Sequence, residues 1–149
     1  MIDLRFSRSL AASVMAACLT VPAAGADVRA KADIACQPTG KTLQYDCTIK
    51  LMDARTDEPL SGIDLAVGAD MPSMPGAHNV RPIKAAAGQA AGTYQARLML
   101  EMLGDWALRL DVSGRVRDRV IKVLRFEEDK VQAAPATASP QPGRTHRKH

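Results

Sequence analysis

The sequence predicts an all-β fold, an immunoglobulin-like antiparallel β-sandwich of about seven short strands. Apolar and polar residues alternate strictly over several short stretches, which is the pattern of strands that are buried on one face. Turn residues separate these stretches, and no amphipathic helical pattern lies between them. We expect a signal peptide over 1–26, the sandwich domain over 27–130, and a disordered tail rich in Pro and Ala over 131–149.

The first 26 residues have the features of a secretory signal peptide. Arg5 and Arg8 give a basic start, a run of mostly small apolar residues spans 10–20, and Ala24–Gly25–Ala26 matches a cleavage signal. Cys18 offers a rival interpretation, a lipid anchor, but the residues before it match a lipoprotein box poorly. We therefore expect a periplasmic protein that is not lipidated and has no transmembrane segment in its mature chain.

The strand pattern runs almost to the end of the predicted domain, and Trp106 is the natural centre of its core. In the last strand the register is open, because Val120 and the apolar residues in phase with it compete with Ile121 and Val123 for the inner face. The predicted strands are 27–36, 42–51, 63–67, a short edge strand 81–84, 93–102, 106–112 and 116–126.

Two cysteines remain after cleavage, and both fall on the inward faces of the first two predicted strands. Because an exported protein meets an oxidising environment, we predict a disulfide between Cys36 and Cys47; two buried free thiols are the alternative. A simple hairpin turning at Thr39–Gly40 would place Cys36 opposite about Leu43 rather than Cys47. A disulfide would then require either a bulged hairpin or two strands from different sheets.

The basic character of the chain comes from its ends. The full chain has 20 Lys and Arg against 16 Asp and Glu, whereas residues 27–130 carry 15 of each. Three of the excess basic residues lie in the tail, at Arg144, Arg147 and Lys148. A formally neutral domain does not suggest a nucleic-acid partner.

A loop rich in proline and methionine, residues 71–82, interrupts the strand pattern and holds the strongest candidate site. Met71, Met74 and His78 lie within eight residues of one another, and thioethers with an imidazole form a ligand set suited to Cu(I). Met102 would complete the set if both segments lie at one end of the sandwich. In the alternative, Met71 and Met74 cap the core and His78 makes a loop hydrogen bond.

The order of several motifs resembles the YtkA-like family of small exported β-sandwich domains. These are Met71–Pro72–Ser73–Met74–Pro75, the nearby His78–Asn79, Gly92–Thr93–Tyr94 at the start of a strand, and Met102–Leu103–Gly104–Asp105–Trp106 at a hairpin. The family includes the periplasmic portion of FixH and domains appended to heavy-metal efflux components. The resemblance implies an immunoglobulin-like fold and a link to copper handling or oxidase assembly. Here Gly76–Ala77 precede the histidine, where relatives often carry a further Met or polar residue.

The sequence contains no pattern that predicts an enzyme, because it has neither a glycine-rich phosphate loop nor paired carboxylates near a histidine. We expect an exported accessory protein that binds Cu(I) through the Met/His loop and acts with an envelope protein partner whose identity the sequence does not give. The alternative is a metal-free protein-interaction module, in which the same loop docks a partner. The strand 93–102 also offers an edge for pairing with a partner.

Overall fold

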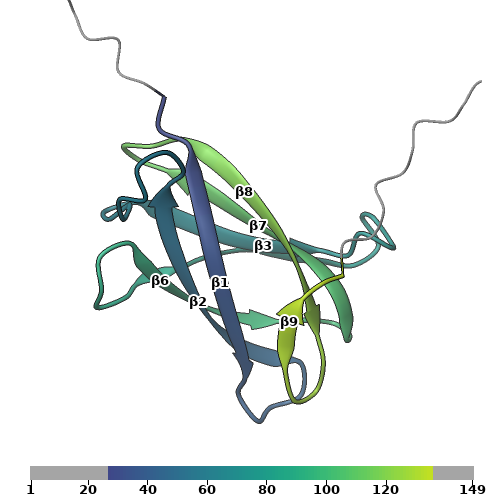
Figure 1. Ribbon diagram of the computed structural model, residues 1–149. Helices are drawn as coiled ribbons and strands as arrows, with labels where there is room; N and C mark the ends of the chain where they lie inside the picture. The colour runs from purple at the N-terminus through teal and green to yellow at the C-terminus, as the bar shows by residue number, and fades with distance from the viewer. Residues whose placement is uncertain (1–26, 136–149) are drawn as a thin grey trace, which may run out of the picture.

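The structure of the protein is a computed structural model that describes residues 27–135. The predicted signal peptide, Cys18 and the basic end of the tail lie outside the described residues. Residues 27–135 contain no helix, and consequently none that could cross a membrane. Within this described part, nine strands form two antiparallel sheets that pack face to face, which confirms the predicted β-sandwich (Figure 1).

The first sheet has the strand order β1-β2-β6-β5 and the second has the order β4-β3-β7-β8-β9. Chain connections alternate between the two ends of the sandwich, as expected for antiparallel strands. The strand bounds are β1 Ala30–Pro38, β2 Gln44–Asp53, β3 Asp64–Asp70, β4 Asn79–Lys84, β5 Ala86–Ala87, β6 Thr93–Met99, β7 Gly104–Ser113, β8 Asp118–Phe126 and β9 Val131–Ala133.

The core fills the space between the sheets with the side chains that the alternation placed inward. Trp106 is fully buried, and its indole N–H donates to the carbonyl of Met102 at 3.1 Å. Tyr45 packs edge-on against Phe126, with ring centroids 4.9 Å apart, and its hydroxyl donates to the carbonyl of Glu127. These contacts join both sheets around Trp106, as the sequence predicted.

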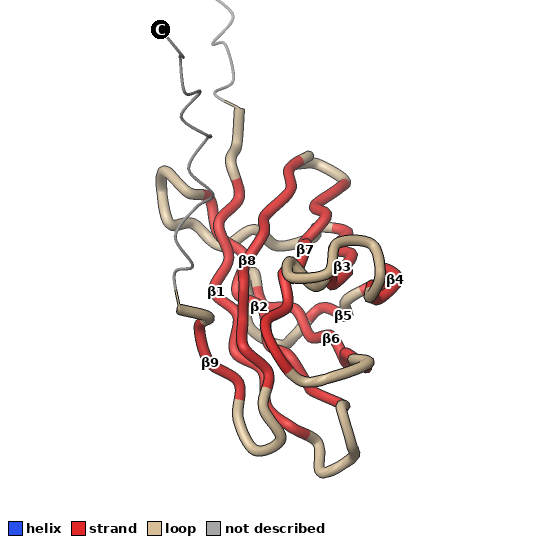
Figure 2. The backbone as a smooth tube through the Cα atoms, turned by 90° about the vertical axis from the view of Figure 1, so that its right-hand side faces the viewer, coloured by secondary structure: helices blue, strands red, loops and turns tan. Residues whose placement is uncertain are grey.

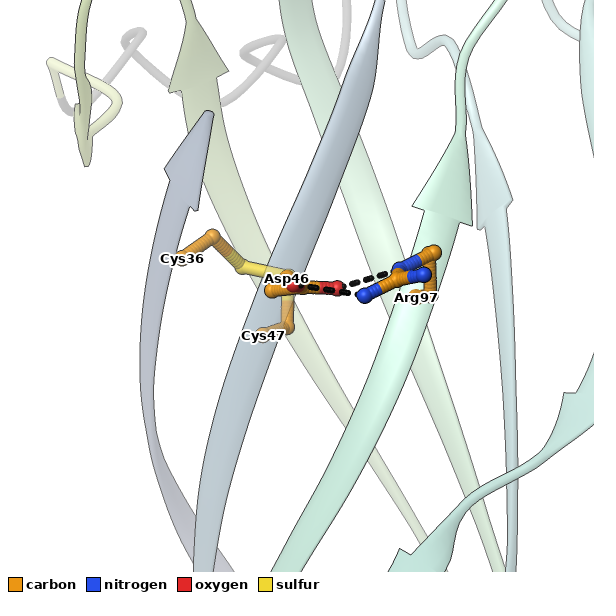
Figure 3. Close-up of a disulfide and its surroundings, with 4 residues drawn as sticks. All are labelled: Cys36, Asp46, Cys47 and Arg97. Atoms are coloured by element: carbon orange, nitrogen blue, oxygen red, sulfur yellow. Dashed lines mark hydrogen bonds and ion pairs between the residues drawn. A yellow bond between two sulfur atoms is a disulfide. The ribbon is translucent and has the colours of Figure 1, made fainter. Parts of the chain in front are cut away.

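Cys36 and Cys47 form a disulfide within the β1–β2 hairpin (Figure 3). The two residues are direct cross-strand partners, so the expectation of a bulged hairpin or of separate sheets was wrong. The turn is longer than a Thr39–Gly40 turn, because Thr39 N–H donates to Gln44 O and the loop holds residues 39–43. Hydrogen-bonded and non-hydrogen-bonded pairs alternate along an antiparallel hairpin, and Thr39 and Gln44 form a hydrogen-bonded pair. Cys36 and Cys47 therefore form a non-hydrogen-bonded pair, in which the two side chains come closest.

The long turn depends on a backbone conformation that the sequence does not reveal. Leu43 ends the loop with a φ of +57°, in the left-handed region that non-glycine residues rarely adopt. Leu43 O accepts a hydrogen bond from Leu100 N at 2.9 Å, which ties the loop to the chain that follows β6. The shift of the turn by about two residues therefore brings the cysteines opposite each other.

The C-terminal strands differ from the sequence prediction in two respects. The register of β8 buries Leu124 and Phe126 and leaves Ile121 and Val123 exposed, which settles the alternatives. The chain then turns and pairs again with β8 as β9, in a stretch that composition had assigned to the tail. Val131 explains this extension, because its side chain packs against the core.

Candidate metal-binding loop

Loop 71–78 joins β3 to β4 and closes through its own main chain. Met71 N–H donates to the carbonyl of His78 at 3.3 Å, and Met74 N–H donates to the carbonyl of Met71 at 3.0 Å. Gly76 has a φ of +77°, which glycine adopts without steric cost. Consecutive turns suit Pro72 and Pro75, since no sheet ladder needs their missing N–H groups. Pro82, the third proline of 71–82, lies in β4, where the pairing with β3 is irregular.

The two methionines of the loop lie in different environments. Met71 is only 3% exposed and belongs to the core, with its Cε 3.4 Å from where a Cβ at Gly104 would stand. Met74 is 39% exposed. Met71 therefore takes the position of a core cap, while Met74 presents its thioether at the surface of the loop.

His78 contacts a carboxylate from the other side of this end of the sandwich. Its Nδ1 lies 2.6 Å from Oε2 of Glu101, which follows β6. The imidazole is partly buried, and Nε2 has no hydrogen-bond partner among residues 27–135. Sequence reasoning did not select Glu101, because the pair is 23 residues apart and only the meeting of two loops brings it together.

Met102 lies next to Glu101, so loop 71–78 and the corner after β6 do share one end of the sandwich. The side chain of Met102 is half-buried and lines a surface cavity of about 460 Å³. Leu43, Tyr45 and Leu103 line the same cavity, whereas the three predicted ligands of loop 71–78 do not. The structure thus places His78 against the neighbour of Met102 and directs Met102 toward the β1–β2 loop.

The corner itself is held by an ion pair at the start of β7. Arg125 donates to both carboxylate oxygens of Asp105, at 2.7 and 2.9 Å, from the adjacent position on β8. These hydrogen bonds hold the pKa of Asp105 below its ordinary value. A fixed corner of this kind keeps the chain before it, which carries Glu101 and Met102, in a defined position.

Residues 27–135 contain no group of three or more His, Cys, Asp and Glu side chains that could hold a metal ion. The donors at this end are the imidazole of His78, the carboxylate of Glu101 that it contacts, and thioethers, and the thioethers suit a soft ion. A predicted Cu(I) site would therefore depend on Met74 and His78 at the surface, with Met71 and Met102 nearby.

The protein is thus a small antiparallel β-sandwich whose loop 71–78 carries two methionines and a histidine. The family model described as YtkA-like matches residues 28–111, more than half of the chain, and the protein belongs to this family. The comparisons with curated proteins and with solved structures gave no significant match. The match covers β1 to β7 almost completely, including the loop and the corner.

Proposed function

We propose that the protein is an exported, non-enzymatic accessory protein of the cell envelope that binds Cu(I) and serves copper handling or oxidase assembly. Membership of the YtkA-like family supports the setting. The contact between His78 and Glu101 is the observation that carries the binding proposal. In this proposal Cu(I) is a cargo, and the domain holds and passes it on.

The carboxylate of Glu101 gives His78 the arrangement of a metal ligand. Histidines that bind metals usually donate the N–H of one ring nitrogen to a carboxylate or carbonyl, which orients the ring and leaves the other nitrogen free to coordinate. Here the bond to Glu101 occupies Nδ1, so Nε2 is the coordinating atom. An imidazole without such a partner would rotate freely and bind more weakly.

The exposed thioether of Met74 is the second ligand that we propose. It lies in the same loop as His78, and both side chains are accessible without any rearrangement of the core. Met71 would join only if the loop opened, because its side chain is buried at 3% exposure. A site with few permanent ligands suits a protein that releases its ion to a partner.

Competition with a Cu(I) chelator tests the proposal. The assay is run anaerobically, in conditions that leave the disulfide intact. Met74→Leu keeps the apolar volume and removes the sulfur, and His78→Ala removes the imidazole. Each should weaken binding at least about tenfold, which corresponds to about 1.4 kcal/mol. Met52→Leu is the matched control, because Met52 is half-buried at the other end of the sandwich, where its main chain forms an isolated β-bridge with Pro59. A parent protein that cannot compete for Cu(I) would refute the proposal.

A metal-free docking module is the second candidate, and the burial of Met71 favours it. In this case Met71 anchors the loop, and Met74 with the exposed Leu103 offers apolar contact to an envelope protein. Met74→Leu would then leave binding of the partner protein largely intact, because leucine preserves the apolar contact area. The same variant therefore separates the two candidates.

A further inference from the structure

A surface cavity of about 460 Å³ opens where loop 39–43, the corner 100–103 and loop 127–130 meet at one end of the sandwich. Loops 39–43 and 127–130 lie side by side at the lower end of the molecule in both views (Figure 1, Figure 2). This volume falls within the range of about 300–1,000 Å³ that is typical of binding sites. The apolar part of the cavity lining comes from Pro38, Leu43, Tyr45, Met102 and Leu103.

Hydrogen bonds hold the walls of the cavity in place. Leu43 O accepts from Leu100 N–H at 2.9 Å, which joins loop 39–43 to the corner. The hydroxyl of Tyr45 donates to the carbonyl of Glu127 at 2.8 Å, which joins β2 to loop 127–130. Glu127 N–H in turn donates to Lys130 O at 2.9 Å and closes that loop. Walls that are fixed before a ligand arrives lower the entropy cost of binding.

The backbone of Leu43 is strained at the point where this residue lines the cavity. Its φ of +57° lies in the left-handed region, which glycine adopts without steric cost and leucine rarely adopts. Because glycine would relieve the strain, a leucine here indicates that the side chain itself contributes. That side chain packs partly against the core, and the residue also forms part of the cavity wall. Backbone outliers of this kind concentrate at binding sites.

The corner supplies a second apolar wall. Leu103 is 43% exposed, and the half-buried Met102 lies beside it. The indole N–H of Trp106 donates to Met102 O at 3.1 Å, so the main chain of this wall is fixed as well. A methionine side chain adapts its shape to an apolar neighbour. The wall therefore suits an apolar group of a ligand.

The charges around the cavity favour a cation. Lys130 forms an ion pair within its own loop at 3.2 Å, whereas Glu128 and Asp129 have no ion pair among residues 27–135. Lys41 in loop 39–43 has none in that range either, so two unpaired carboxylates face one unpaired ammonium group. Glu128 lines the cavity beside Tyr45, and burial together with this negative charge raises the pKa of the Tyr45 phenol.

We propose that the cavity binds a segment of a partner protein that places one apolar side chain against Leu43 and Leu103 and a neighbouring lysine or arginine beside Glu128. The apolar walls hold the first group, and the carboxylates of loop 127–130 attract the second. Lys41 limits the site to one such cation. The proposal does not depend on Cu(I), because loop 71–78 does not line the cavity.

Titration of the mature, metal-free protein with short blocked peptides tests the proposal by NMR. The basic probe is acetyl-Gly-Leu-Lys-Gly-amide; the acidic probe carries Glu in place of Lys, and the truncated probe carries Ala in place of Leu. We expect the basic probe to bind with a dissociation constant of about 1 mM, since it covers little surface, and to shift amide signals of the three cavity loops. The acidic and truncated probes should each bind at least about fivefold more weakly.

Two variants with matched controls locate the binding site. Leu103→Ser should weaken binding of the basic probe at least about fivefold. Val123→Ser should have no effect, because Val123 is 40% exposed on the outer face of β8 and does not line the cavity. Glu128→Gln should reduce the preference for the basic over the acidic probe, whereas Glu58→Gln, in an exposed loop at the other end of the sandwich, should preserve it. Thermal unfolding confirms that each variant folds.

Several results would overturn the proposal. One is a basic probe that shifts no signals of the cavity loops at about 10 mM, and another is equal binding of all three probes. A loss of binding in Val123→Ser as large as in Leu103→Ser, or an unchanged preference in Glu128→Gln, overturns it as well. If the free protein self-associates on sedimentation and Leu103→Ser abolishes this, a second copy occupies the cavity and the proposed partner is wrong.

Discussion

Replacing Met71 with alanine tests whether the first methionine of the loop is a core residue. Met71 is 3% exposed and packs toward Gly104, so the change removes buried methylene groups and the sulfur and leaves a cavity. Truncation of a buried methionine costs about 2–5 kcal/mol, and we expect about 3 kcal/mol here, because the loop can collapse only in part. For a domain of this size that loss lowers the midpoint of thermal unfolding by about 12 °C or more.

Two further variants give this measurement its reference points. Met74→Ala should cost less than about 1 kcal/mol, because Met74 is 39% exposed in the same loop. Met71→Leu conserves volume and should cost less than about 1.5 kcal/mol. Urea unfolding with the disulfide intact measures all three. If Met71→Ala and Met74→Ala destabilise the protein equally, Met71 is not a core cap and the reasoning fails.

Two other predictions concern the hairpin and the corner. Replacing Cys36 and Cys47 together with alanine should lower the free energy of unfolding by about 2–3 kcal/mol, since the bond constrains the unfolded chain; an unfolding midpoint of the parent that does not respond to a reductant would contradict this. Asp105, whose pKa is lowered by hydrogen bonds from Arg125, stabilises the fold above the unfolded pKa of about 3.9 and loses this contribution as the pH falls through its lower folded pKa. The stability difference between the parent and Asp105→Asn should therefore be largest near neutral pH and shrink below about pH 4; a difference that is independent of pH would argue against the pair.

Period-two alternation predicted most of the sandwich correctly because each sheet has one buried face. In β2, Tyr45, Cys47, Ile49 and Leu51 are all buried, as the pattern placed them. Register between strands was harder, because it depends on turn length. The turn before β2 includes Leu43 with a positive φ, a conformation usually supplied by glycine, and no sequence rule assigns it to leucine.

The candidate site was predictable in its parts and not in its contacts. Proline content predicted a loop over 71–82, which the structure shortens to 71–78 because β4 begins at Asn79, and the spacing of Met71, Met74 and His78 selected the side chains. Burial then separated Met71 from Met74, although both are followed by proline in the sequence. The partner of His78 is contributed by a corner far along the chain, so tertiary packing alone determines it.

A single topological feature accounts for the accessible surfaces on this side of the molecule. β4 pairs with β3 in one sheet, and the chain then crosses at Ala85, whose N–H donates to the carbonyl of Leu65, to enter the other sheet as β5. β4 stays in the second sheet and lies against β6 without pairing with it. Because β4 begins at Asn79 beside the corner after β6, the residue before it, His78, contacts Glu101. The crossing thus places loop 71–78 beside the corner after β6, where Oε2 of Glu101 contacts His78.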